Sequence, residues 1–239
     1  MTNEERSDLI VVAAITKNEE YIDKAISSVN NHNFHKKYIL LDGAQPGKLK
    51  THYEKYKKYK KNLRKHYSDF EIIEYDECIY YRKILDKFLK ENYEAVSKNL
   101  LIIQDDVVLD NFDLEKVLQL KADFTDPFLK IIYFRENIRR APHWFNVIEE
   151  CANGVEELIK THGWSERVYL TTKEDLKYIL ENLPSKGGCN GKFIEFYYQN
   201  MMQRKTWKTI TDEEQLDYWK KWGCYEHKDI HHKHLVAKR

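Results

Sequence analysis

The first half of the chain alternates short apolar runs with stretches in which apolar residues recur every three or four positions. The apolar runs predict strands at residues 9–15, 38–41, 70–75 and 100–103. The periodic stretches predict helices at residues 19–30, 48–66 and 79–93. Such alternation is typical of β-α units. It predicts an α/β fold with a mostly parallel central sheet flanked by helices.

The second half is less regular. Residues 129–134 and 167–170 predict strands, and Thr172 is a suitable N-cap for a helix that ends before Pro184. Residues 184–191 are rich in glycine and predict a loop, and a further helix is expected at residues 193–203. Because no linker or repeat interrupts the pattern, we expect a single domain over residues 1–239, with halves at 1–118 and 119–239.

Composition narrows this picture to a folded protein in a reducing compartment. The 239 residues can bury one α/β core, and 40 Lys and Arg against 39 Asp and Glu disfavour a generally basic nucleic-acid binder. Four widely spaced cysteines lack zinc-site spacing, which predicts free thiols. The apolar run near the N-terminus is shorter than the ~20 residues of a membrane span and follows acidic residues. We therefore expect a cytoplasmic protein.

One segment concentrates positive charge. Residues 48–66 carry nine Lys or Arg with tyrosines between them, starting at Lys48 and ending with Lys65 and His66. As a helix, the segment has a Tyr and Leu stripe opposite a basic face. The simplest interpretation is a solvated helix covering an edge of the sheet. Peripheral contact with an anionic membrane surface, or attraction of another polyanion, is the functional alternative.

Asp105 and Asp106 directly follow the apolar run at residues 100–103. Ligands of open α/β sheets bind beyond the carboxyl ends of such strands. Two adjacent carboxylates repel each other, and a fold that removes them from water usually supplies a cation, for which Mg²⁺ or Mn²⁺ suits their oxygens. The alternative is that the pair caps a helix starting near Asp110.

Other predicted strand exits also carry polar residues, and their order resembles a known family. The first strand runs into Thr16-Lys17-Asn18-Glu19-Glu20, the second into Asp42-Gly43, and Arg82 lies near the start of the helix after the third. This order is similar to that of GT-A type nucleotide-sugar glycosyltransferases, close to the large inverting family whose first strand runs into Asn-Glu-Glu. It also resembles the glycosyltransferases of large DNA viruses. The resemblance covers residues 9–110.

The resemblance implies a Rossmann-like GT-A fold, a UDP-sugar donor and a Mn²⁺ or Mg²⁺ cofactor. Residues 1–118 are then the nucleotide-sugar half and residues 119–239 the acceptor half with a C-terminal tail. The residues that the resemblance assigns to the nucleoside and diphosphate are Ala14, Thr16, Lys17, Asp42 and Arg82. Within this set, Asp42 is expected to accept the uracil N3–H bond and Arg82 to approach the diphosphate or the base.

Gln104-Asp105-Asp106 stands in for the family's Asp-x-Asp motif, with Asp105 near the ribose and Asp106 on the metal. Gln104 is a departure, because it replaces the first acid of the motif. In the tail, the resemblance suggests that His232 and His234 reach the metal and that Lys233 reaches the diphosphate. His232 and His234 share a side if the segment is extended. The alternative is a solvated basic tail.

Glu195 is the candidate catalytic base, because it is a lone acid among aromatic residues just after the glycine-rich loop. Burial among rings raises a carboxyl pKa toward the range useful for a base. The alternative is an ordinary acid in the first turn of a helix.

These residues predict an enzyme, a metal-dependent glycosyltransferase that moves a sugar from a UDP-sugar to an acceptor hydroxyl on a glycan or a protein-linked sugar. The transfer inverts the anomeric centre if Glu195 is the base. The alternatives are a nucleotidyltransferase with paired Asp and Mg²⁺, and a non-enzymatic module that binds a polyanion. No P-loop, G-x-S-x-G, H-E-x-x-H or G-x-G-x-x-G motif is present. No nucleic-acid partner is expected, and a viral protein would work in the host cytoplasm.

Overall fold

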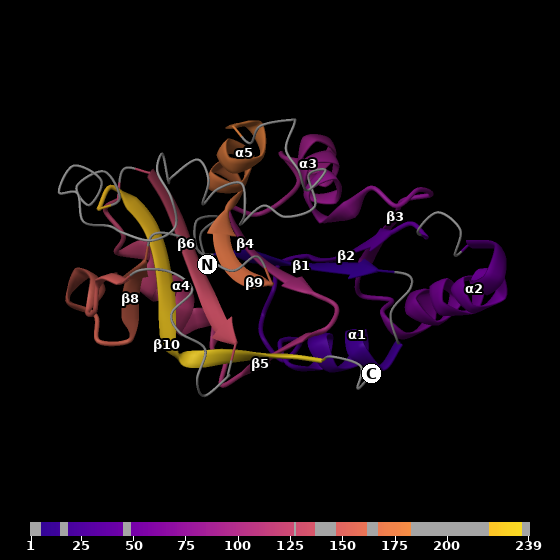
Figure 1. Cartoon of the computed structure of the whole chain (residues 1–239), viewed down its shortest axis with the longest axis horizontal. Coiled ribbons are helices and arrows are strands. Elements are labelled where there is room, and N and C mark those ends of the chain that lie inside the picture. The colour runs from indigo at the N-terminus through magenta and orange to yellow at the C-terminus, as the bar shows by residue number, and fades with distance from the viewer. Residues whose placement is uncertain are drawn as a thin grey trace.

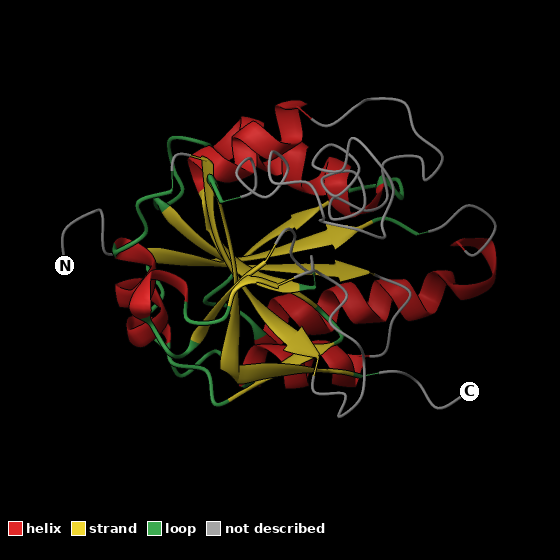
Figure 2. Cartoon of the chain, turned by 60° about the vertical axis from the view of Figure 1, so that its left-hand side comes forward, coloured by secondary structure: helices red, strands yellow, loops and turns green. Residues whose placement is uncertain are grey.

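The computed structural model describes residues 6–14, 19–44, 49–126, 128–136, 147–161, 167–182 and 220–235. The helices are α1 Glu19–Ser27, α2 Leu49–His66, α3 Tyr80–Asn92, α4 Leu114–Ala122 and α5 Lys173–Asn182, with a short 3₁₀ turn at Ala152–Gly154. The strands are β1 Ser7–Ala14, β2 Lys37–Asp42, β3 Glu71–Glu74, β4 Asn99–Gln104, β5 Val107–Asp110, β6 Phe128–Glu136, β7 Val147–Glu149, β8 Leu158–Thr161, β9 Val168–Thr172 and β10 Trp222–His234. All ten strands join one sheet, with helices on both of its faces (Figures 1 and 2).

The sheet order is β3-β2-β1-β4-β9-β6-β10-β8-β7, with β5 paired to β10. The strands β3, β2, β1 and β4 are parallel, and β10 is parallel to β6. The strand β9 runs antiparallel between β4 and β6. This arrangement confirms the predicted α/β fold and its mostly parallel central sheet. The seven elements predicted from residue 9 to residue 103 each correspond to a strand or helix of the structure.

The central strands are apolar at nearly every position because both faces of the sheet are covered. Along β1, Leu9 and Val11 pack in the core shared with α1, α2 and α4, whereas Ile10 and Val12 pack in the core shared with α3 and α5. All four side chains are buried. The continuous apolar run therefore reflects a position in the middle of three layers, and the polar side chains of β1, Ser7 and Asp8, are at its start.

The alternative that Asp105 and Asp106 cap a helix is wrong. Residues Val107–Asp110 form strand β5, and α4 begins only at Leu114. Its N-cap is Asp113, whose side chain accepts a hydrogen bond of 3.1 Å from the backbone N–H of Lys116. The predicted cap at Thr172 is confirmed, since its hydroxyl accepts the N–H of Asp175 at 3.0 Å. The predicted loop at 184–191 and helix at 193–203 lie outside the described residues.

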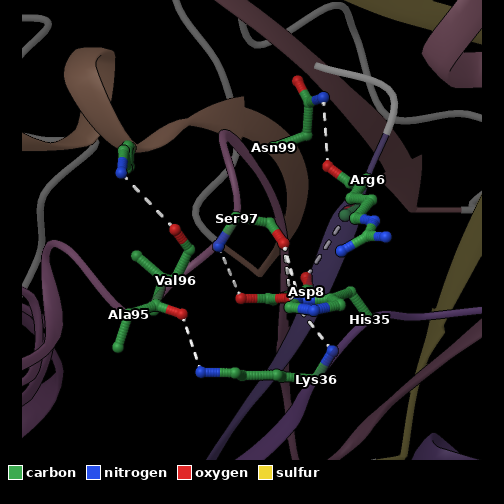
Figure 3. A network of polar contacts seen from close by, with 10 residues as sticks. Arg6, Asp8, His35, Lys36, Ala95, Val96, Ser97 and Asn99 are labelled. Atoms are coloured by element: carbon green, nitrogen blue, oxygen red, sulfur yellow. Dashed lines mark hydrogen bonds and ion pairs between the residues drawn. The ribbon is translucent and has the colours of Figure 1, made fainter. Parts of the chain in front are cut away.

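A buried carboxylate fastens three chain segments at the amino-terminal ends of the parallel strands (Figure 3). Asp8, with no exposed surface, lies at the start of β1. It accepts hydrogen bonds from the backbone N–H of Lys36 at 3.0 Å and from the N–H and hydroxyl of Ser97 at 2.7 and 2.8 Å. The Nδ1 atom of His35 lies 3.4 Å from the same carboxylate. Asp8 thus ties the segments that precede β2 and β4 to β1.

Lys121 is a buried cation that should make stability depend on pH. Burial lowers its pKa to about 8, against an opposing attraction from Asp175, and its Nζ donates to Asn99 Oδ1 at 3.2 Å. Between pH 8 and 10.5 the unfolded state binds more protons at this site, so stability rises with pH in that window. We expect Lys121→Met to raise the free energy of unfolding at pH 7 by about 1–3 kcal/mol and to flatten that rise.

Urea unfolding at several pH values, followed by circular dichroism, measures both effects. Lys116→Met, at an exposed position on the same helix, is the control. It removes only an exposed ion pair of 3.1 Å with Glu157 and should change stability by less than about 1 kcal/mol. A Lys121→Met protein with the same pH dependence as the wild type would contradict the prediction.

Two further expectations can be compared with the described residues. Cys78, Cys151 and Cys224 are in no disulfide bond, as predicted, while Cys189 lies outside the described ranges. Within those ranges, no helix combines the length and the apolar character that a membrane crossing requires.

Candidate functional site

Five of the predicted site residues of the first half lie at the carboxyl-terminal edge of the parallel strands. Ala14 ends β1, Asp42 ends β2 and Gln104 ends β4. These strands are adjacent, because β1 pairs with both β2 and β4. Asp105 and Asp106 follow in the turn that joins β4 to β5. The sheet topology therefore brings residues from three separate chain segments to one edge.

Asp105 fastens the exit of β4 to the end of β1. Its backbone N–H donates to the carbonyl of Val12 at 3.1 Å, and its Oδ2 accepts the N–H of Ala14 at 2.9 Å. Only 2% of the residue is exposed. The carboxylate thus holds the end of β1 in place beside the following acid, in addition to any contact it makes with a ligand.

Asp106 meets a histidine from the other end of the chain. The Nε2 atom of His234 lies 2.8 Å from Asp106 Oδ2, although the two residues are 128 positions apart. The backbone N–H of Leu235 also donates to the carbonyl of Asp106, at 2.7 Å. Both contacts follow from the antiparallel pairing of β10 with β5, in which His234 is opposite Val107. Asp106 is buried and the His234 side chain is 24% exposed, so the pair borders solvent.

The chemistry of this pair fits a divalent cation. Carboxylate oxygen and imidazole nitrogen are ligands of Mn²⁺ and related ions. In the structure the Asp106 Oδ2 and His234 Nε2 atoms are hydrogen-bonded at 2.8 Å, and an ion bound by both would replace the proton between them. Two neighbouring ligands at ~2.1 Å from one ion lie about 3 Å apart, so the two atoms would have to move little. Among the described residues, no group of three or more His, Cys, Asp or Glu is placed to hold a metal ion. An ion with two protein ligands is the arrangement in which substrate phosphates complete the coordination.

His232, the other predicted histidine ligand, is placed differently. It is 1% exposed, and its Nδ1 donates to the carbonyl of Phe134 at 2.5 Å. Lys233, between the two histidines, is exposed. This part of the tail is the end of strand β10, where His231–His234 pair with β5 and the first two of them also pair with β6. The alternative of a solvated tail is therefore wrong for the buried His232, whereas the Lys233 side chain is exposed. The structure brings His234 to Asp106, whereas a metal role for His232 stays a prediction.

Another buried histidine in β10, His227, has no role in the predicted site. Burial lowers its pKa. Its Nδ1 accepts the backbone N–H groups of Asp229 and Ile230 at 3.2 and 3.3 Å. These contacts hold the irregularity in β10 that separates the part of the strand paired with β8 from the part paired with β5.

Asp42 already has partners at the start of α3. Its carboxylate accepts the backbone N–H groups of Ile79 at 2.8 Å and of Tyr80 at 3.3 Å, and the Cys78 thiol lies 3.3 Å from it. Tyr80 has a φ of 66°, a left-handed conformation that is uncommon for a residue with a side chain. These bonds hold the first turn of α3, which carries Arg82, against the end of β2. The predicted contact of Asp42 with uracil would have to be made beside them.

The remaining predicted residues differ in how much the structure says of them. Arg82 and Gln104 are partly exposed, and the N–H of Gln104 donates to the carbonyl of Arg167 at 3.0 Å. Thr16, Lys17 and Glu195 lie outside the described residues. Their predicted roles, two in the nucleoside pocket and one as base, stay predictions.

A buried polar pair that the sequence analysis did not single out lies farther along the sheet. The hydroxyl of Tyr133 on β6 donates to Glu226 Oε2 on β10 at 2.8 Å, and both residues are buried. Burial and, less strongly, the charge of Glu226 raise the pKa of Tyr133. The strands pair in parallel with these two residues opposite each other. The sequence of β10, WGCYEHKDIHHKH, has no regular alternation of polar and apolar residues that could have signalled this contact.

Comparison with known proteins was informative only at the level of structure. No protein-family model matches the sequence, and no curated protein matches it either. Among solved structures, GalNAc-T7 with UDP, GalNAc and Mn²⁺ superposes with a TM-score of 0.56 at 8% sequence identity. That alignment covers 97% of this chain and 43% of GalNAc-T7, so the chain spans less than half the length of its neighbour. The likeness shows the predicted GT-A type, Rossmann-like fold.

Two other neighbours align less well. The Pyrobaculum calidifontis mannosyltransferase with GDP-Man and Mn²⁺ has a TM-score of 0.46 at 10% identity, over 77% of this chain and 49% of that one. A UDP-glucose pyrophosphorylase with UDP-glucose also has a TM-score of 0.46, at 11% identity, over 84% of this chain and 88% of that one. At these scores neither likeness adds weight to the assignment of the fold.

Proposed function

We propose that this protein is a metal-dependent glycosyltransferase that transfers a sugar from a UDP-sugar to an acceptor hydroxyl. The observation that carries the proposal is the contact of Asp106 with His234 at 2.8 Å, at the carboxyl-terminal edge of the sheet. Support comes from the fold, which is shared with GalNAc-T7, a protein whose structure contains UDP, GalNAc and Mn²⁺. The predicted resemblance to enzymes of large DNA viruses is not needed for it.

In this proposal Asp106 and His234 hold the divalent ion, and His232 is a further candidate ligand. A bound Mn²⁺ or Mg²⁺ would neutralise charge on the diphosphate leaving group. Arg82 and Lys233 are the cationic side chains assigned to the diphosphate. Asp105, whose Oδ2 already accepts the Ala14 N–H, would approach the ribose.

The remaining roles concern the nucleoside and the acceptor. Ala14, Thr16, Lys17 and Asp42 are assigned to the nucleoside pocket, next to Gln104. Glu195 is assigned as the base that accepts the proton of the acceptor hydroxyl in an inverting transfer. Glu195→Gln should then lower turnover while UDP binding is kept, and an unchanged rate would remove Glu195 from the mechanism.

Calorimetric titration with UDP, in the presence and absence of Mn²⁺, tests the proposal. We expect binding that requires the ion, because the proposed site has only two described protein ligands for it and the diphosphate would complete its coordination. When UDP-sugars are then tested one by one without an acceptor, we expect the true donor to be hydrolysed slowly by water, with release of UDP.

Two outcomes would contradict the proposal. Release of pyrophosphate from UTP with a sugar phosphate would indicate a nucleotidyltransferase. Absence of binding to any nucleoside diphosphate with Mn²⁺ would leave the acids with a structural role.

A further inference from the structure

Helix α2 carries a row of lysines that other parts of the protein do not neutralise. Lys57, Lys58, Lys61 and Lys65, here called the lysine face, are exposed and make no ion pair within the described part of the chain. Residues four apart on a helix are neighbours, so Lys61 lies between Lys57 and Lys65, which repel it. The only acid of the helix is Glu54. The lysines of the lysine face therefore repel one another, and no acid of α2 beyond Glu54 offsets this repulsion.

The opposite side of α2 is anchored to the protein. Tyr56, Tyr59 and Leu63 are buried in the core that α2 shares with α1 and α4. Two other basic residues, Lys60 and Arg64, form ion pairs of 2.9 and 2.6 Å with Glu74 on β3. The helix is thus fixed in rotation by a buried stripe and by ion pairs on one flank. The lysine face is left as a rigid, outward surface.

An aromatic side chain lies at one end of this surface. Tyr53 is 56% exposed, one of two large hydrophobic side chains that are exposed among the described residues. It precedes Lys57 by four positions, so the two side chains are neighbours on the helix. Tyrosine is favoured where its ring can lie in apolar surroundings while its hydroxyl contacts water, as at a membrane–water interface.

The position of α2 also makes the lysine face accessible to a large partner. Figure 1 shows α2 at the outer end of the sheet, beyond β3 and far from β6 and β10. Figure 2 shows the same projection from another side. A single helix at the end of a molecule offers a convex surface, which suits a flat partner better than a strand of nucleic acid, for which proteins usually provide a groove.

We propose that α2 docks on the surface of an anionic lipid bilayer through the lysine face, with Tyr53 at the headgroup level. The chain as a whole has a net charge of only +1, so the attraction depends on this local concentration of charge. Each lysine near an anionic leaflet strengthens binding about fivefold, and the effect falls off within a Debye length. This docking is independent of the proposed enzymatic function.

Vesicle co-sedimentation of the full chain tests the proposal, with EDTA present and no nucleotide. Binding is expected to vesicles of phosphatidylcholine with one third phosphatidylserine, weakening as salt is raised, and not to phosphatidylcholine alone. The triple variant Lys58→Glu, Lys61→Glu, Lys65→Glu should bind at least on the order of 100-fold more weakly. Tyr53→Ser should reduce binding by a smaller factor, without changing its salt dependence.

The control reverses three exposed lysines elsewhere in the chain, Lys83, Lys90 and Lys221, of which Lys90 forms an exposed ion pair with Asp86 at 2.8 Å. It changes the net charge by the same amount and should keep vesicle binding within a few fold. Equal loss in the control, or no binding of the wild type to anionic vesicles, would overturn the proposal. So would binding of single-stranded nucleic acid or heparin that the α2 variant loses while vesicle binding is absent. Circular dichroism of both variants verifies that they fold.

Discussion

Replacing Asp106 by Asn is expected to abolish Mn²⁺-dependent UDP binding and to lower sugar transfer roughly a thousandfold. Metal and charge stabilisation of a leaving group supplies several kcal/mol, and each 1.4 kcal/mol is a factor of ten in rate. Asn keeps the shape of Asp but lacks the negative charge that a hard cation prefers. The carbonyl of Asp106, which accepts the Leu235 N–H, is unaffected by the change. The fold should therefore survive.

Asp110→Asn is the matched control, because Asp110 is an exposed acid at the end of β5. It should leave both UDP affinity and turnover within about twofold of the wild type. Titration calorimetry with Mn²⁺ and a UDP-release assay provide the two measurements. If Asp106→Asn bound UDP and Mn²⁺ as the wild type does, its assigned metal role would be wrong. A His234→Gln variant should also lose UDP affinity and turnover, but by a smaller factor than Asp106→Asn, since the charged ligand Asp106 remains.

Replacing Asp8 by Ala is expected to destabilise the protein by about 3–5 kcal/mol. The change leaves buried or partly buried donors of Lys36 and Ser97 without their acceptor, and each such loss costs about 1–3 kcal/mol. It also removes the bond that fastens the segments before β2 and β4 to β1. Urea unfolding followed by circular dichroism measures the loss.

Asp76→Ala, at an exposed position, is the control and should change stability by no more than about 0.5 kcal/mol. Asp8→Asn should fall between the wild type and Asp8→Ala, because an amide oxygen still accepts one of the N–H groups. Asp8 lies at the amino-terminal end of the parallel strands, whereas Asp42 and Asp105 lie at the carboxyl-terminal end. The affinity of folded Asp8→Asn for UDP should therefore be unchanged. A loss below about 1 kcal/mol for Asp8→Ala would show that water replaces its partners.

The strands and helices up to residue 103 could be predicted because each is encoded by the pattern of polar and apolar residues within its own segment. Leu100–Ile103 is apolar at every position since both faces of β4 are covered, and the placement of Asp105 and Asp106 at the sheet edge follows from the strand ending there. The resemblance to GT-A enzymes depended on the same strand exits. The second half gave weaker signals, and strands β7, β8 and β10 were not predicted.

The alternative that Asp105 and Asp106 cap a helix was wrong for a reason that lies outside the local sequence. Val107–Asp110 is short, and it is a strand only because β10 pairs with it from the other end of the chain. Without that partner, the acids followed by Asp110 and Asp113 look like the start of a helix. The pairing in turn places His234, and not a neighbour, beside Asp106.

The sequence alone determined the alternation of strands and helices, the acids at the exit of β4 and the concentration of lysines in α2. Each of these features depends on residues within one element, and the spacing and polarity of those residues can be read directly from the sequence. Only the tertiary structure decided which histidine meets Asp106, that Asp42 is bound to the start of α3, and which lysines of α2 remain unpaired. These depend on register and rotation between distant elements, which are fixed by packing of the whole core.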